Sequence, residues 1–375
     1  MAGIYVHIPF CKQACNYCDF HFSTKLANKT EVLAAMEVEL EHRKDFLKGE
    51  EIRTIYFGGG TPSILSEGEL VRIVNRIQNI FKLSSDYEFT LEVNPDDISI
   101  DKLKSWRALG INRLSMGVQS FKESDLTFMN RAHNSAEAID GLRLARSIFS
   151  NISIDLIYGV PGMSLEDWDS NISEVIAMDI PHVSAYALTV EPNTKLANQI
   201  AKGKCQPVDE DMAAVHFDHL VSRLDQANFE HYEISNFAKP HFRSEHNSSY
   251  WLGETYLGIG PAAHSYKDNI RSWNISNNTK YTKALSKGGN YRETETLSVQ
   301  EQYNEFIMIS LRTIEGISEL NLINRFGVAV FERFKTDVSD FILQGDIVIK
   351  DGYYRLNTAA RFRADGIASD LFWID

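Results

Sequence analysis

The sequence predicts an α/β fold: a partial TIM-type barrel of six β/α units, (β/α)6, followed by a smaller helical, winged-helix-like domain. Two observations carry this prediction. Over the first 190 residues, short apolar runs alternate with segments of helical period every ~30–40 residues, as in parallel strands joined by helices. From about residue 298, helical segments end in a hairpin-like stretch. Periodicity alone does not separate a partial barrel from a doubly wound sheet.

The predicted strands and helices alternate strictly. Each strand run ends in glycine or polar residues, and in a β/α barrel the loops after the strands' carboxyl ends build the site. We therefore expect the functional residues at these ends. The predicted strands are 3–10, 52–60, 87–95, 112–120, 151–159 and 182–190, and the predicted helices between them are 29–47, 66–81, 100–110, 135–149 and 164–178.

The alternation stops after residue 190. A helix is expected over 208–228, and the segment 240–280 is rich in aromatic residues, Asn, Gly and His. The tail ends in GDIVIKDGYYRLN (345–357), which resembles a wing. The expected organisation is a core barrel with the cysteine loop (1–190), a barrel extension (191–295) and a C-terminal domain (296–375).

Composition limits the classes of function. The 375-residue chain has a formal net charge of −13, which disfavours nucleic acid as a partner. No run of 18 apolar residues predicts a membrane span, and the N-terminus does not read as a secretory signal. We expect a cytoplasmic protein, with peripheral contact at the membrane left open. In a reducing compartment, clustered cysteines more often bind metal than form disulfides.

Three of the four cysteines form C-x3-C-x2-C directly after the first strand. Cys11, Cys15 and Cys18 could bind three irons of a [4Fe–4S] cluster and leave the fourth iron open to a non-protein ligand. A structural zinc site, with His7 or His21 as fourth ligand, is the alternative that spacing leaves open. Cys205 lies far away in sequence and is expected to be a bystander thiol.

The segment YVHIPFCKQACNYC (5–18) resembles the signature of the radical S-adenosylmethionine (SAM) superfamily, in the form used by the coproporphyrinogen dehydrogenase and HemW group. The resemblance covers most of the chain, including its C-terminal domain. It implies that SAM chelates the open iron and that the cluster's electron can cleave SAM to a 5′-deoxyadenosyl radical. The supporting motifs are FGGGTPS (57–63), LEVNP (91–95), RLSMGVQSF (113–121), NRAH (130–133) and SIDLIYGVPG (153–162).

The resemblance also implies a set of SAM contacts at the strand ends. The glycines would present N–H groups to the methionyl part, Glu92 would bind the amine or ribose, Arg131 a carboxylate and Asp155 the ribose hydroxyls. Taken singly, each of these residues also fits an ordinary turn or surface position. The implied SAM-binding residues are Tyr5, Tyr17, Gly59, Gly60, Thr61, Glu92, Gln119, Arg131, Asp155 and Ala187.

Three features separate the two branches of the group. Coproporphyrinogen dehydrogenases typically have a further cysteine where this chain has Phe20, and a leader of tens of residues before the first strand, which here starts at residue 3. The segment EHNSSYW matches the H-N-x-x-Y-W arrangement of HemW proteins, associated there with haem binding. Its residues are His246, Asn247, Tyr250 and Trp251; a structural aromatic cluster is the alternative reading.

We therefore expect a haem chaperone that binds haem, a [4Fe–4S] cluster and SAM and delivers haem to apo-haemoproteins such as respiratory enzymes. The alternative is an oxygen-independent coproporphyrinogen III dehydrogenase; no catalytic residue is assigned, and whether SAM is cleaved stays open. A flavodoxin or ferredoxin is the expected electron donor. His264 is a reserve iron ligand, and Lys239, Arg243 or Arg271 are candidates for the haem propionates.

Overall fold

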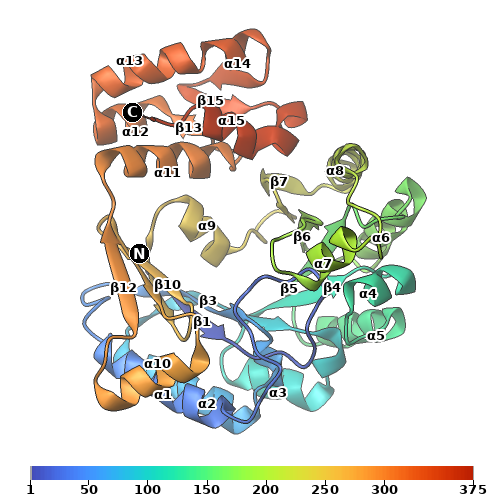
Figure 1. Ribbon diagram of the computed structural model, residues 1–375, viewed down its shortest axis with the longest axis vertical. Coiled ribbons are helices and arrows are strands. Elements are labelled where there is room, and N and C mark those ends of the chain that lie inside the picture. Colours follow the sequence, from blue (N-terminus) through green and yellow to red (C-terminus); the bar gives the residue numbers. More distant parts are fainter. Residues whose placement is uncertain (1, 375) are drawn as a thin grey trace.

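The computed structural model describes residues 2–374 and places six parallel strands side by side at its centre (Figure 1). Their order in the sheet follows their order in the chain, because each helical crossover returns the chain to the next position. All six predicted strands are present, and the α/β partial-barrel prediction is confirmed. The strands are β1 (Ala2–Ile8), β2 (Ile52–Gly59), β3 (Leu83–Val93), β4 (Arg113–Gln119), β5 (Asn151–Tyr158) and β6 (His182–Ala187).

Helices cover the outer side of this sheet (Figure 1). Helix α2 illustrates how local sequence sets a boundary: the Ser66 hydroxyl accepts from the Glu69 N–H, and the Glu69 carboxylate accepts from the Ser66 N–H. The following residues Leu70, Ile73 and Ile77 repeat at helical spacing and are buried. The helices of this layer are α1 (Lys29–His42), α2 (Glu67–Ile80), α3 (Ile100–Ala108), α4 (Glu123–Met129), α5 (Ser135–Arg146) and α6 (Leu165–Ala177).

The chain after α6 widens the sheet at both edges. Strand β9 adds parallel to β1, and the antiparallel strands β10 to β12 follow it, whereas β8 and β7 extend the other edge from β6. The sheet is therefore open rather than closed into a barrel. These elements are α7 (Lys195–Ala201), α8 (Glu210–Gln226), β7 (Glu230–Glu233), β8 (Asn236–Ala238), α9 (Glu245–Trp251), β9 (Thr255–Ile259), β10 (His264–Lys267), β11 (Ile270–Asn274), α10 (Asn278–Lys287) and β12 (Arg292–Thr296).

A buried carboxylate fixes this extension to the barrel. Glu39 of α1 accepts hydrogen bonds from the Gly260 N–H at 2.8 Å, from Asn274 Nδ2 at 2.7 Å and from the Tyr281 hydroxyl at 2.6 Å. Burial raises the pKa of Glu39, and the three donors oppose that rise. One side chain thus joins α1 to the turn after β9, to β11 and to α10.

The last residues pack around a second hydrophobic cluster of their own, which runs from Tyr303 to Leu371. Helix α11 lies across the open side of the barrel, above α9 (Figure 1). Its carboxyl end is tied to β7, because Arg312 Nε donates to Glu233 Oε1 at 3.1 Å. The elements are α11 (Val299–Leu311), β13 (Ile317–Ser318), α12 (Glu319–Phe326), α13 (Val328–Asp337), α14 (Ser339–Leu343), β14 (Ile347–Lys350), β15 (Tyr353–Leu356) and α15 (Ala364–Asp370).

None of the helices within residues 2–374 combines the length and the apolar composition needed to cross a bilayer.

Candidate functional site

The three clustered cysteines lie on the loop that follows β1. Cys11, Cys15 and Cys18 are partly exposed and none is in a disulfide. Burial raises the pKa of the Cys11 and Cys18 thiols to about 11, so a bound cation is needed to hold them as thiolates at neutral pH. Arg131 Nη1 donates to Cys15 Sγ at 3.2 Å and supplies one positive charge. Three thiols on one loop, with a guanidinium beside them, fit the donor set of a [4Fe–4S] cluster.

The zinc alternative is less well supported by the surrounding histidines. The ring nitrogens of His7 contact the Tyr5 hydroxyl at 3.1 Å and the His21 carbonyl at 2.9 Å, and His21 Nε2 contacts Asn278 Oδ1 at 2.8 Å. Within residues 2–374, no three His, Cys, Asp or Glu side chains are grouped as they are around a single metal ion. In a cuboidal cluster each thiolate binds a different iron, so the thiols need not meet at one point.

The glycine motif is positioned as expected, but its amides are not free. The Gly59 N–H donates to Glu92 Oε2 at 3.2 Å, the Gly60 N–H to the Ile8 carbonyl at 2.8 Å and the Thr61 N–H to the Phe10 carbonyl at 2.7 Å. In this conformation these three N–H groups have acceptors within the protein, and their contact with the methionyl part of SAM stays a prediction. The motif instead joins β2 to the start of the cysteine loop, where it remains beside the candidate SAM site.

Two carboxylates at strand ends share the barrel interior. Glu92 of β3 accepts from the Tyr56 hydroxyl at 2.8 Å and from the Gly59 N–H. Burial, together with the negative charge of Asp155, raises the pKa of Glu92 to about 7. Burial raises the pKa of Asp155 on β5 to about 6. Near neutral pH the pair can therefore take up or release a proton, and a bound cation such as an ammonium group would favour the ionised form.

Arg131, in the loop after α4, contacts the cysteine loop, and Gln119 is the last residue of β4. Arg131 Nη2 donates to Asn94 Oδ1 at 2.9 Å and to the Gly117 carbonyl at 2.7 Å, while its Nε is buried without a partner among the described residues. That Nε–H is a guanidinium donor that makes no hydrogen bond within the described residues. Gln119 is buried and has a φ of 67°, a strained left-handed conformation that is common at functional sites.

Three members of the expected SAM set remain: Tyr5 lies on β1 with its hydroxyl 3.1 Å from His7 Nδ1, and Tyr17 and Ala187 follow at the same end of the barrel. Tyr17 contacts Cys15 and feels the positive charge of Arg131, and burial raises the pKa of its phenol. Ala187 is the last residue of β6 and pairs with Tyr158 of β5. Most of the ten residues thus lie at or just after the carboxyl ends of the six strands, whereas Tyr5 and Asp155 lie in the middle of β1 and β5 and Arg131 follows α4.

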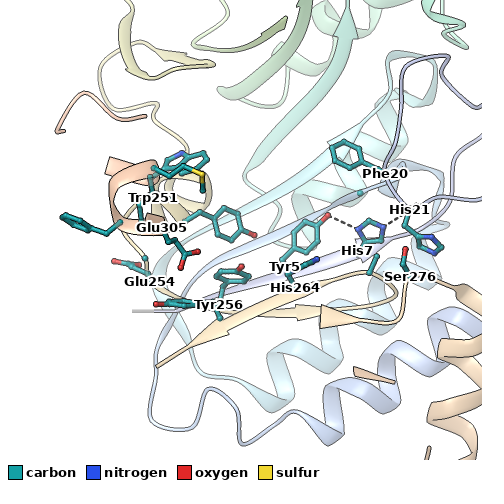
Figure 2. A pocket seen from close by; sticks show the side chains of 18 of the residues that line it. Tyr5, His7, Phe20, His21, Trp251, Glu254, Tyr256, His264, Ser276 and Glu305 are labelled. Carbon is teal, nitrogen blue, oxygen red and sulfur yellow. Dashed lines mark hydrogen bonds between the residues drawn. The ribbon is translucent and has the colours of Figure 1, made fainter. Parts of the chain in front are cut away.

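A cavity of about 700 Å³ opens beside this set and reaches the C-terminal helices. Figure 2 shows Tyr5 and His7 at one end, Phe20 and His21 from the cysteine loop, and Trp251 and Tyr256 at the other end. Phe20 is 68% exposed and lines the cavity. The cavity also contains Gly59, Glu92, Tyr250, Glu254, His264, Tyr266, Ser276, Gln302, Glu305, Phe306, Met308, Ile309 and Arg325 among its lining residues.

The EHNSSYW segment forms α9 and divides into two faces. Tyr250 and Trp251 line the cavity, whereas His246 is buried behind them. His246 Nδ1 contacts Thr54 Oγ1 at 2.8 Å and its Nε2 contacts the Tyr250 hydroxyl at 2.9 Å, so neither nitrogen is free for iron. Burial lowers the pKa of His246 to about 3, which keeps the ring neutral. Asn247 lies in the first turn of the helix, where its N–H donates to Oγ of the N-cap residue Ser244 at 3.3 Å.

His264 differs from His246 in its exposure, its place on the cavity wall and the hydrogen bonding of its ring, which decide whether a histidine can bind iron. It is exposed, lines the cavity and stacks on Trp273 with ring centroids 6.1 Å apart. Partial desolvation of the ring, together with the positive charge of Arg271, lowers its pKa, and among the described residues no side chain or carbonyl is hydrogen-bonded to the ring. A neutral imidazole with free nitrogens is the form that binds iron.

The expected propionate partners are already neutralised. Lys239 pairs with Asp179, Arg243 with Glu230 and Glu315, and Arg271 with Glu295 and Glu305. None of the three lines the cavity, and their contact with propionates stays a prediction.

The C-terminal wall of the cavity was missed from sequence. Helix α11 carries four consecutive apolar residues, from Phe306 to Ile309, and its own core can bury only one side of such a run. Phe306, Met308 and Ile309 line the cavity, and Ile307 packs inside. The unbroken apolar run was the available signal.

The fold and the three-cysteine loop define the class of the protein: a radical SAM protein. The Radical SAM superfamily matches residues 5–174, and the HemN C-terminal domain matches residues 297–363. This class carries a [4Fe–4S] cluster and SAM. A solved structure, coproporphyrinogen III oxidase (HemN) from Escherichia coli, has a TM-score of 0.85 and 23% identity, covering 99% of this chain and 90% of that one, and it supports the fold alone.

Curated relatives specify the branch. Heme chaperone HemW of Bacillus subtilis is 35% identical over 92% of this chain and 92% of its own length. Heme chaperone HemW of Lactococcus lactis is 35% identical over 91% and 89%, and that of Escherichia coli K12 is 30% identical over 94% and 93%. The chain belongs to the HemW family.

Proposed function

We propose that the protein is a haem chaperone: it holds haem in the cavity beside the cluster and SAM and passes it to apo-haemoproteins such as respiratory enzymes. The observation that carries this proposal is the aromatic-lined cavity of about 700 Å³ between the cysteine loop and α11. Its volume is in the range of small-molecule sites, and flat aromatic rings are suited to a macrocycle. The names of the HemW relatives support the same ligand.

The cofactors would be held by the residues that meet at the strand ends. Cys11, Cys15 and Cys18 would bind three irons, and Arg131 Nε and Glu92 would bind the carboxylate and the amine of SAM. When bound, these groups supply one-electron chemistry. The chain's own part is to orient SAM and to balance charge: Glu92, with a pKa of about 7, gives up its proton as the ammonium arrives.

For the haem iron we propose His264 as the protein ligand. Its ring faces the cavity and its nitrogens have no hydrogen-bond partner among the described residues, whereas ligation by His246 would first break its contacts with Thr54 and Tyr250. Tyr250 and Trp251 would pack against the macrocycle, with His246 holding the Tyr250 hydroxyl in place.

A flavodoxin- or ferredoxin-type electron donor and a cytoplasmic location with contact at the membrane surface complete the proposal. The partly exposed cysteine loop supports the first, since a docked donor would come close to the cluster.

One experiment tests the function directly. Anaerobically reconstituted protein is given SAM, reductant and either haem or coproporphyrinogen III. We expect saturable haem binding, transfer to an apo-haemoprotein, and no protoporphyrinogen. Protoporphyrinogen formation would instead establish the dehydrogenase activity and overturn the chaperone proposal.

The ligand assignment needs a matched pair of variants. His264→Ala should change the Soret spectrum of the bound haem and weaken binding, while His246→Phe should leave the ligand-field bands unchanged. The reverse pattern would move the iron ligand to His246.

A further inference from the structure

Arg325 is an uncompensated positive charge on the cavity wall. It lies on α12, is exposed, and is the one lysine or arginine among the described residues that line the cavity. Its guanidinium lies over the rings of Phe306 at 5.1 Å and Phe326 at 5.3 Å. Within residues 2–374, the Arg325 guanidinium forms no ion pair and no hydrogen bond with another residue. The two rings hold the side chain without neutralising it.

The acidic residues that line the cavity do not pair with Arg325 within residues 2–374. They are Asp19, Glu92, Glu254 and Glu305, and the cationic partner of Glu305 is Arg271. Arg325 acts across the cavity on Tyr266 of β10: burial and Glu305 raise the pKa of this phenol, and Arg325 lowers it. An anion entering between α12 and β10 would therefore meet a cation that is still available.

The chemistry of the wall matches an amphipathic planar ligand. Phe306, Met308 and Ile309 of α11 present apolar surface next to the guanidinium. Haem has the same division: an apolar macrocycle with two carboxylates along one edge. A guanidinium binds a carboxylate through two parallel N–H···O bonds, which fixes orientation as well as adding affinity.

We propose that Arg325 binds a propionate of the tetrapyrrole in the cavity, so that the carboxylate edge of the ring faces α12. This inference rests on the proposed function and adds to it a specificity-determining residue from the C-terminal helices. It also replaces the three cations expected from sequence, each of which already has a carboxylate partner.

The test compares Arg325→Gln with Arg355→Gln in the full-length protein. Arg355 is a matched control: its guanidinium lies over Tyr353 at 5.1 Å in the same C-terminal region, and it does not line the cavity. Each variant is titrated with haem and with haem dimethyl ester, whose propionates carry no charge. We expect Arg325→Gln to weaken haem binding about tenfold or more, Arg355→Gln to have little effect, and the ester to bind all three proteins alike.

Two results would overturn the inference: equal haem affinity of the two variants, or an equal loss by Arg325→Gln for haem and ester, which would indicate a structural defect. Failure of the proposed function is distinguishable, because then the wild type itself would not bind haem. In that case quenching of coproporphyrin fluorescence, with free carboxylates and no iron, repeats the comparison. A selective loss in Arg325→Gln supports propionate recognition, and no selective loss, or no binding, overturns it.

Discussion

Replacing Gly60 by alanine should damage the junction between the glycine motif and the cysteine loop. An added Cβ would lie 2.6 Å from the Phe10 carbonyl oxygen and 2.7 Å from the Ile8 carbonyl oxygen, both backbone atoms. These same oxygens accept from the N–H groups of Thr61 and Gly60. The end of β1 must move to relieve these two close contacts. We expect a loss of stability of about 1–3 kcal/mol from overpacking and a similar loss from the two weakened hydrogen bonds, about 2–6 kcal/mol together.

The assay is urea unfolding of the apoprotein, with iron and sulfide content after anaerobic reconstitution as a second readout. Gly68→Ala on α2 is the control, because its added Cβ would meet no atom within 4 Å, and its stability should stay within about 1 kcal/mol of the wild type. Equal stability and equal iron content of the two variants would refute the reasoning, since it depends on the close backbone approach at Gly60 alone.

Three further predictions follow from the site. SAM affinity, measured by calorimetry, should rise between pH 6 and 8 as Glu92 ionises, and it should not change with pH in Glu92→Gln. Because the folded protein raises the pKa of Glu92 to about 7, the contribution of Glu92 to stability falls as the pH rises from the pKa of the unfolded chain towards 7. Cys15→Ala should lose the cluster, measured as iron per chain, while Cys205→Ala keeps about four irons; equal iron in both would contradict the ligand set. Glu39→Ala should destabilise the protein by about 3 kcal/mol or more, because three buried donors lose their acceptor; an unchanged urea midpoint would rule out that role.

The barrel could be predicted because its signals are local. Each strand is a short apolar run, and a residue such as Ser66 marks the start of a helix within a few positions. The strand-end rule then gathers residues that are far apart in sequence, such as Glu92 and Asp155, at one end of the sheet. These parts of the site follow from periodicity and topology.

The rest depends on contacts that no local pattern encodes. Sequence places His246 in a haem-associated motif, but its two nitrogens are taken by Thr54, 192 positions away, and by Tyr250. The same holds for the glycine amides, whose acceptors belong to β1, β3 and the cysteine loop. The role of α11 and Arg325 depends on how the C-terminal helices pack over the barrel, which composition cannot specify.

The shared cavity couples ligand affinity to domain contact. A ligand that touches both the barrel and α11 adds RT ln(1 + [L]/Kd), about 2.7 kcal/mol at one hundred times Kd, to the stability of the liganded arrangement. The coupling is reciprocal. A partner that binds α11 away from the barrel lowers the affinity for the ligand by the same factor by which the ligand lowers the affinity for that partner. Binding of a partner to α11 then favours release of the ligand without any bond within the ligand being broken.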